Sequence, residues 1–198
     1  MPTSTPTRAW LIRGYCGAGH SDAIPRDGDT PWCRRHHRRD GKEQSLNDTH
    51  PARFTIDDAI VIAAQAHRGQ RDKGRHDLPY VTHPMRVMAR FTDPELQMIA
   101  VLHDAVEDSG HLDVPVTLDT LRTAGASSRV LAGIESMTHP EGESDEDYWR
   151  RLRLNPDAVA VKNADIDDNT DEDRLALLPP AKRTTLAAKY ERARRAIN

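Results

Sequence analysis

Residues 98–108 read MIAVLHDAVED, and the rest of the chain is best interpreted from this stretch outward. Apolar residues recur in and before it with helical spacing, at Leu96, Ile99, Ala100 and Val106. This pattern predicts a helix that runs through the stretch to its end. On such a helix His103 and Glu107 lie four positions apart and share a face. The same holds for Asp104 and Asp108.

The polar groups of this stretch point to two alternatives. An imidazole and three carboxylates on one turn and its exit would repel each other in an ordinary core. A divalent cation removes the conflict, because it accepts imidazole and carboxylate ligands together. The other interpretation is a solvated helix end that happens to be acidic, since short motifs recur by chance. The choice between a metal site and a solvated helix end depends on the residues elsewhere in the chain.

Length and composition favour one helical domain with a small appendage. The chain has 198 residues, of which 37% are hydrophobic and 30% are charged. No apolar run is long enough to span a bilayer, and residues 1–12 lack the apolar segment of a secretory signal. We therefore expect a cytoplasmic protein with no membrane partner. The net charge of −3 gives no general reason to expect nucleic-acid binding.

The sequence changes character near residue 52. Before it the chain is rich in Gly, Pro, Ser, Thr and Asp without a sustained period, and after it helical patterns follow one another. We therefore predict an N-terminal arm and linker over residues 1–52 and an all-α domain over 53–198, with no β-hairpin. The expected N-caps of its helices are Thr55, Thr82, Thr117, Ser144 and Asn155. The last helix is expected to follow Pro179 and Pro180 and to end near Ile197.

The arm contains a candidate zinc site. Its ligands would be Cys16, His20, Cys33 and one of His36 and His37, which form two short pairs separated by a loop. Zinc would explain how so short a segment with few apolar residues could fold. The alternative is an unstructured arm with incidental Cys and His.

A run of basic residues between residues 34 and 42 could also contact nucleic acid. Such a run is more often solvated, and Asp40 interrupts it, so we expect no nucleic-acid partner.

Four places in the main domain lie at or near the ends of expected helices: His67, His103-Asp104, Glu107-Asp108 and Asp165. Any one of them has an ordinary explanation. A His at a helix end can cap it, and a lone Asp in an apolar helix can pair with a Lys such as Lys162. Side chains from separate helix ends can converge, however, and four such positions in one small domain favour a shared site.

The order of these segments resembles a known family. The matching segments are AHRGQ (66–70), PYVTHP (79–84), LHDAVED (102–108) and VKNAD (161–165) running on to Asn169. Over residues 54–197 the pattern resembles the HD-type metal-dependent phosphohydrolases. It is most similar to their alarmone (guanosine tetraphosphate) hydrolase branch, which comprises the SpoT and RelA hydrolase domains and the small alarmone hydrolases. The resemblance implies an all-helical HD-domain bundle.

The resemblance also implies roles for particular residues. The four metal ligands would be His67, His103, Asp104 and Asp165, with Mn²⁺ as the usual ion. Glu107 and Asp108 would orient the attacking water and manage protons as catalytic residues. The contacts to the nucleotide and its phosphates would be Arg71, Lys73, Tyr80, Lys162 and Asn169. This donor set suits Mn²⁺ better than a thiolate-preferring ion and leaves positions for water and a phosphate oxygen.

The chain departs from the family pattern at three positions. Asp72 stands where a basic residue is usual, Asn163 replaces an aliphatic residue, and Ile166 replaces a basic one. Since we expect these positions to face the phosphates and the base, the departures bear on the substrate. The leading hypothesis is a hydrolase that removes the 3′-pyrophosphate from guanosine tetra- or pentaphosphate. One alternative is hydrolysis of another phosphorylated nucleotide, such as a nucleoside triphosphate or NADPH, and another is a non-catalytic nucleotide-sensing module.

Overall fold

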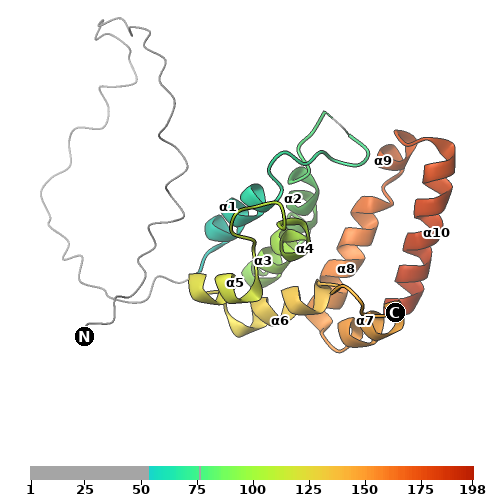
Figure 1. Cartoon of the computed structure of the whole chain (residues 1–198). Coiled ribbons are helices and arrows are strands. Elements are labelled where there is room, and N and C mark those ends of the chain that lie inside the picture. Colours follow the sequence, from blue (N-terminus) through green and yellow to red (C-terminus); the bar gives the residue numbers. More distant parts are fainter. Residues whose placement is uncertain (1–53, 76) are drawn as a thin grey trace, which may run out of the picture. The chain divides into compact units, whose positions relative to one another are not determined.

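The computed structural model describes residues 54–75 and 77–198, which form helices and one isolated β-bridge, between Arg71 and Pro79. This confirms the predicted all-α class (Figure 1). The helices are α1 (Ile56–Ala66), α2 (Thr82–Met88), α3 (Pro94–Leu102), α4 (Ala105–Asp108), α5 (Leu118–Ala124), α6 (Ser128–Met137), α7 (Asp145–Arg153), α8 (Pro156–Asn169), α9 (Glu172–Ala176) and α10 (Pro180–Ile197).

The candidate zinc ligands Cys16, His20, Cys33, His36 and His37 lie outside the described residues, as do the basic run and the domain boundary near residue 52.

Most predicted N-caps are confirmed. Thr55 begins α1 with a complete capping box, in which Asp58 bonds back to the backbone of Thr55. Thr117, Ser144 and Asn155 cap α5, α7 and α8 through their side chains.

The prediction for Thr82 is wrong. Thr82 is the first residue of α2, and its hydroxyl donates to the carbonyl of Pro79 instead of accepting from the helix. The preceding turn continues directly into α2, because Val81 already has helical dihedral angles and offers no capping side chain.

The expected continuous helix over residues 98–108 is interrupted. The helix α3 ends at Leu102 and α4 begins at Ala105, with His103 and Asp104 between them. Asp104 takes dihedral angles of φ −100° and ψ −7°, and its carbonyl then accepts the amide of Asp108 at 2.9 Å. The sequence contains no Gly or Pro here, so periodicity alone continues the helix through the break. The side chains of both residues contact polar groups from other segments: Asp104 accepts the hydroxyl of Tyr80, and His103 lies 3.6 Å from Asp165.

The core is organised around α3. Residues 98–102 are all buried, because α1, α2, α6 and α8 pack around this helix (Figure 1). Such burial on several sides explains why the segment is apolar almost all round. Gly133 lets α6 approach closely, since a Cβ atom at this position would overlap the side chain of Ile99. The largest fully buried apolar side chains are Ile99, Leu102, Leu121, Ile134, Leu152, Ile166, Val87, Val101 and Val130.

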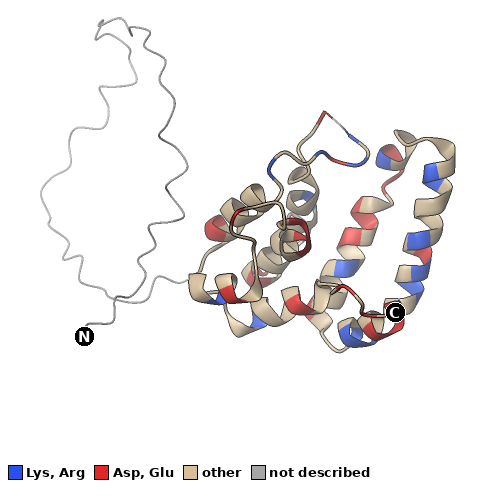
Figure 2. Cartoon of the chain, in the orientation of Figure 1, with Lys and Arg blue, Asp and Glu red and all other residues tan. Residues whose placement is uncertain are grey.

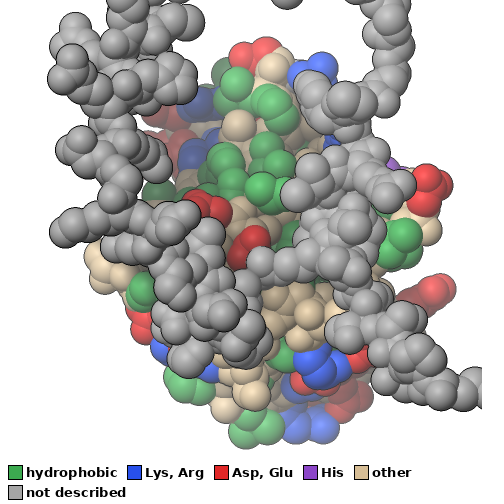
Figure 3. All heavy atoms as spheres, turned by 90° about the vertical axis from the view of Figure 1, so that its left-hand side faces the viewer, with side chains coloured by type: hydrophobic (Ala, Val, Ile, Leu, Met, Phe, Trp, Pro, Cys, Tyr) green, Lys and Arg blue, Asp and Glu red, His purple; other side chains and the backbone are tan. Residues whose placement is uncertain are grey.

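The charged residues are unevenly distributed over the helices. Acidic positions gather on α4 and α8, whereas basic positions recur along α10, which packs against α8 (Figure 2). On the face drawn in Figure 3, hydrophobic side chains form a central strip with charged ones near it. Within residues 54–75 and 77–198, no helix is both long and apolar enough to cross a membrane.

Candidate metal centre

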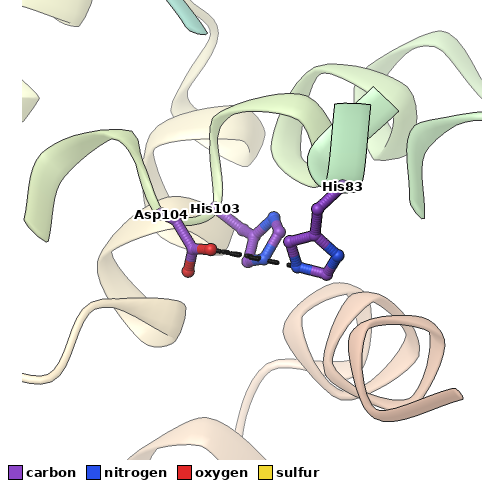
Figure 4. A group of neighbouring side chains, drawn as sticks. All are labelled: His83, His103 and Asp104. Atoms are coloured by element: carbon purple, nitrogen blue, oxygen red, sulfur yellow. Dashed lines mark ion pairs between the residues drawn. The ribbon is translucent and has the colours of Figure 1, made fainter. Parts of the chain in front are cut away.

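Three side chains from the ends of three helices meet in the interior. His83 comes from α2, and His103 and Asp104 come from the break between α3 and α4. Their potential ligand atoms all lie within 4.8 Å of one another, and the side chains point toward one another (Figure 4). His103 Nε2 lies 3.2 Å from Asp104 Oδ2, and both histidine rings are buried. The break between α3 and α4 therefore delivers two polar side chains to one point.

Asp165 joins this group from the middle of α8. Its Oδ1 lies 3.1 Å from His83 Nε2 and 3.6 Å from His103 Nε2. Lys162 donates to its Oδ2 at 2.9 Å, as the sequence suggested. Although burial alone would raise the pKa of Asp165, the charge of Lys162 holds this pKa well below its usual range. The carboxylate is therefore ionised and available to a cation.

His67 caps the C-terminal end of α1 and is also buried. Its ring packs edge-on against Tyr80, with the centroids 4.9 Å apart. Nδ1 lies 3.1 Å from the side-chain oxygen of Gln70, whose amide group donates to the carbonyl of Asp108. Because that oxygen can only accept, His67 carries its proton on Nδ1 and leaves a lone pair on Nε2. Burial lowers the pKa of His67, which favours the neutral ring that a metal requires.

His103 repeats this arrangement. Its Nδ1 lies 2.7 Å from the carbonyl oxygen of Ala100, an acceptor, so that in the neutral ring that binds a metal Nε2 carries the lone pair. Among the described residues, His67 Nε2 and His103 Nε2 are the buried side-chain atoms that have no hydrogen-bond partner. Buried polar atoms are almost always satisfied. His103 Nε2 lies beside Asp104 and Asp165, and the charge of Asp104 also acts on His67. The group fits a divalent cation, since it would satisfy the imidazoles and neutralise the carboxylates.

Glu107 and Asp108 lie beside this centre on α4. Glu107 accepts the backbone amide of His139 at 2.5 Å, and Asp108 Oδ2 lies 3.7 Å from His67 Nδ1. Burial raises the pKa of both carboxyls, and the charge of Asp104 raises each further. Raised pKa values suit groups that exchange protons during a reaction.

A cavity of about 350 Å³ opens next to the centre. The predicted substrate contacts Lys73, Tyr80, Lys162 and Asn169 line it, together with both acidic residues of α4. Arg71, which was also predicted to contact the substrate, is not among the described residues that line the cavity. Its guanidinium lies 3.4 Å from the carbonyl oxygen of Asp77. The sequence interpretation did not single out further lining residues that carry aromatic or basic groups: His139, Tyr148, Trp149, Lys189, Tyr190 and Arg192.

Sequence reasoning also missed His83 and Asp168. His83 stands inside the quoted segment 79–84, but a His-Pro pair at a helix start carries no sign of a polar site. Its nearest carboxylates, Asp165 and Asp168, come from α8, more than 80 residues further along the chain. No local pattern could have joined them.

Two of the departures from the family pattern do not face the cavity, contrary to the expectation. Asp72 is fully buried, accepts the amides of Gly74 and Arg75, and forms ion pairs with Arg86 and Arg174. Ile166 is fully buried in the core. The third departure, Asn163, donates to the carbonyl of Val159 one turn earlier. These substitutions therefore change the scaffold around the site more than its lining.

Comparisons with known proteins found a relative by sequence and a solved structure of similar fold. No family model matches the chain. A curated relative, guanosine-3′,5′-bis(diphosphate) 3′-pyrophosphohydrolase MESH1 of Danio rerio, is 38% identical over 97 residues, which cover 44% of this chain and 51% of the relative. The match thus spans about half the length of that relative.

A solved structure of a metazoan SpoT ortholog that hydrolyzes ppGpp superposes with a TM-score of 0.57 at 22% identity, covering 72% of this chain and 85% of the other. At this identity the superposition shows the fold alone. In sequence over part of its length and in fold over most of it, the chain resembles the HD-domain alarmone hydrolases of the MESH1 and SpoT type.

Proposed function

We propose that this protein is a metal-dependent HD-type phosphohydrolase that removes the 3′-pyrophosphate from guanosine tetra- or pentaphosphate. The observation that carries the proposal is that two buried imidazole nitrogens, His67 Nε2 and His103 Nε2, have no hydrogen-bond partner, and that His103 Nε2 lies beside Asp104 and Asp165. The relative's name and the fold support the substrate class. We expect His67, His103, Asp104 and Asp165 to hold one Mn²⁺ ion. A bound divalent ion lowers the pKa of water and polarises a phosphoryl group.

The acidic residues Glu107 and Asp108 of the cavity then serve proton transfer. Glu107, with its raised pKa and its carboxylate fixed by the amide of His139, orients the water and accepts its proton. Asp108, whose pKa is also raised by burial and which lines the same cavity, supports this proton transfer. Proton transfer by a positioned group contributes roughly 100- to 10,000-fold in rate.

The cations of the cavity bind the polyphosphate. Lys162 stays charged, because the carboxylates of Asp165 and Asp104 raise its pKa despite burial. The Lys73 ammonium lies over the Tyr80 ring, 5.6 Å from its centroid, and adds a positive charge to the lining of the cavity. Fixed positive charges in such a site stabilise charge that develops on phosphate oxygens.

The direct test is to incubate the full chain with Mn²⁺ and a panel of nucleotides and to identify the products. The panel contains guanosine tetra- and pentaphosphate, nucleoside triphosphates and NADPH. Release of pyrophosphate from the guanosine tetra- and pentaphosphates alone supports the proposal. Release of phosphate from another member would assign the second substrate class, and nucleotide binding without turnover would assign a sensing role.

A further inference from the structure

A second cluster of charged side chains lies directly behind the candidate metal centre, and Asp168 is at its middle. This carboxylate is buried on α8. Its Oδ2 lies 2.7 Å from His83 Nδ1, and it accepts hydrogen bonds from Arg86 at 2.8 and 3.0 Å and from Arg174 at 2.5 Å. The charged donors Arg86 and Arg174 hold this carboxylate in place. Asp168 is thus a fixed, ionised acceptor.

Both arginines also form ion pairs with a second carboxylate, that of Asp72. Arg86 Nη2 lies 3.0 Å from Asp72 Oδ2, and Arg174 Nη2 lies 3.2 Å from Asp72 Oδ1. Asp72 is itself anchored by the amides of the 70–75 loop. The cluster therefore ties α2, α8, α9 and this loop together. Displacing Asp168 would leave both arginines with Asp72 as their shared carboxylate, which is costly because Arg174 is buried.

This arrangement determines which nitrogen of His83 carries a proton. Asp168 offers only acceptor atoms at 2.7 Å, so Nδ1 must donate to it. Arg174 Nη1 also lies 3.2 Å from Nδ1, which is farther than the 2.7 Å between Nδ1 and Asp168 Oδ2, so the contact with Asp168 is the stronger one. The lone pair of His83 therefore belongs on Nε2.

The carboxylate oxygens around His83 Nε2 favour a cation at this position. Nε2 lies 3.1 Å from Asp165 Oδ1 and 4.0 Å from Asp104 Oδ2. A lone pair facing carboxylate oxygens at these distances is repelled unless a positive charge lies between them. The free lone pair of His103 Nε2 belongs to the same group of atoms.

We propose that Asp168 is a positioning residue, which fixes the ring and the tautomer of His83 so that Nε2 binds the divalent cation. Carboxylates that accept the second N–H of a metal-bound histidine act in this way in many metal sites. The proposal rests on the metal-binding part of the proposed function. It adds His83 to the expected ligands and gives a role to Asp168, Arg86 and Arg174.

The first experiment measures Mn²⁺ affinity by calorimetry. Asp168→Asn keeps the side-chain volume and removes the charge, and we expect it to weaken Mn²⁺ binding roughly 10- to 100-fold. The matched control is Asp167→Asn, because this neighbouring carboxylate is 45% exposed and pairs with Arg90 and Arg194 at the surface. The control should bind Mn²⁺ as the wild type does. Unchanged affinity in Asp168→Asn would overturn the proposal.

A double-mutant cycle tests whether Asp168 acts through His83. Once His83→Gln has removed the ring, adding Asp168→Asn should change Mn²⁺ affinity by less than about twofold. A general structural role of Asp168 would instead make the two losses multiply. Multiplying losses would overturn the proposal even where each single variant binds weakly.

The third measurement needs no variant that has to fold without the cluster. In wild-type protein loaded with diamagnetic Zn²⁺ as the probe, ¹⁵N NMR of the His83 ring should show a proton on Nδ1 and none on Nε2. A proton on Nε2 overturns the proposal. If the wild type binds neither ion, the metal-dependent function fails as well, whereas normal wild-type binding with an undisturbed Asp168→Asn variant rejects only the positioning role.

Discussion

The phenolic hydroxyl of Tyr80 donates a 2.6 Å hydrogen bond to Asp104 Oδ2. Tyr80 is buried, and burial together with the charge of Asp104 raises its pKa, so the hydroxyl keeps its proton. The family resemblance implies a substrate contact at this position, whereas the hydrogen bond gives Tyr80 a second role in orienting a candidate metal ligand. The two roles have different consequences for metal binding.

We expect Tyr80→Phe to weaken Mn²⁺ affinity about 10-fold, because the Asp104 carboxylate loses the donor that orients it. Calorimetry on the variant measures this directly. Tyr190→Phe is the matched control, since Tyr190 also lines the cavity and its hydroxyl has no hydrogen bond to Asp104. A Tyr80→Phe variant with wild-type Mn²⁺ affinity and a raised KM would restrict the hydroxyl to substrate binding.

Asp104→Ala should lose both bound Mn²⁺ and hydrolysis while the helical circular-dichroism signal survives. The physical reason is that Asp104 Oδ2 lies closest to His103 Nε2 among the carboxylate oxygens of the centre. Elemental analysis of the purified variant gives the metal content. Stoichiometric Mn²⁺ in this variant would remove Asp104 from the ligand set.

Glu107→Gln should retain metal and nucleotide and lower kcat roughly 100- to 10,000-fold, because the amide cannot accept the proton of the attacking water. Steady-state kinetics beside a Mn²⁺ titration separate the two effects. Glu146→Gln, at an exposed position in the first turn of α7, is the control and should keep the wild-type rate. Near-normal turnover in Glu107→Gln would exclude this residue as the base.

Gly133→Ala should destabilise the fold by about 1–3 kcal/mol, because the added methyl group overlaps the buried side chain of Ile99 and forces α6 away from α3. Urea unfolding followed by circular dichroism measures the change. Gly110→Ala meets open space and should shift the free energy of unfolding by less than about 0.5 kcal/mol. Equal stability of the two variants would show that the helices can separate at little cost.

Removal of residues 1–50 should leave hydrolysis intact and remove one zinc ion per chain. The prediction follows from Cys16, His20, Cys33 and one of His36 and His37, whose thiolates favour Zn²⁺ over the ion of the catalytic centre. Zinc binding would supply folding free energy on the order of 10 kcal/mol to this segment. If the full chain, purified without a chelator, contains no zinc at these cysteines, the zinc hypothesis is wrong.

Local chemistry made much of the fold predictable. The hydroxyl and amide side chains of Thr55, Thr117 and Asn155 cap helices through contacts within three residues, so sequence alone located these helix starts. The same reasoning failed at Thr82, where the preceding turn supplied the helix start. It also failed at the break after Leu102, because periodicity continues through His103 and Asp104.

The sequence by itself determined the helical class and most helix starts, because these depend on neighbours a few positions apart. It also suggested His67, His103, Asp104 and Asp165 as polar residues that could share a site. Only the tertiary structure decided which of them meet. The contacts of His83 with Asp165 and Asp168 join segments more than 80 residues apart. Asp72, which was expected to face the cavity, is buried instead and forms ion pairs with Arg86 and Arg174. Such pairings depend on how helices pack and on the need to neutralise charge in the interior, and neither leaves a periodic trace in the chain.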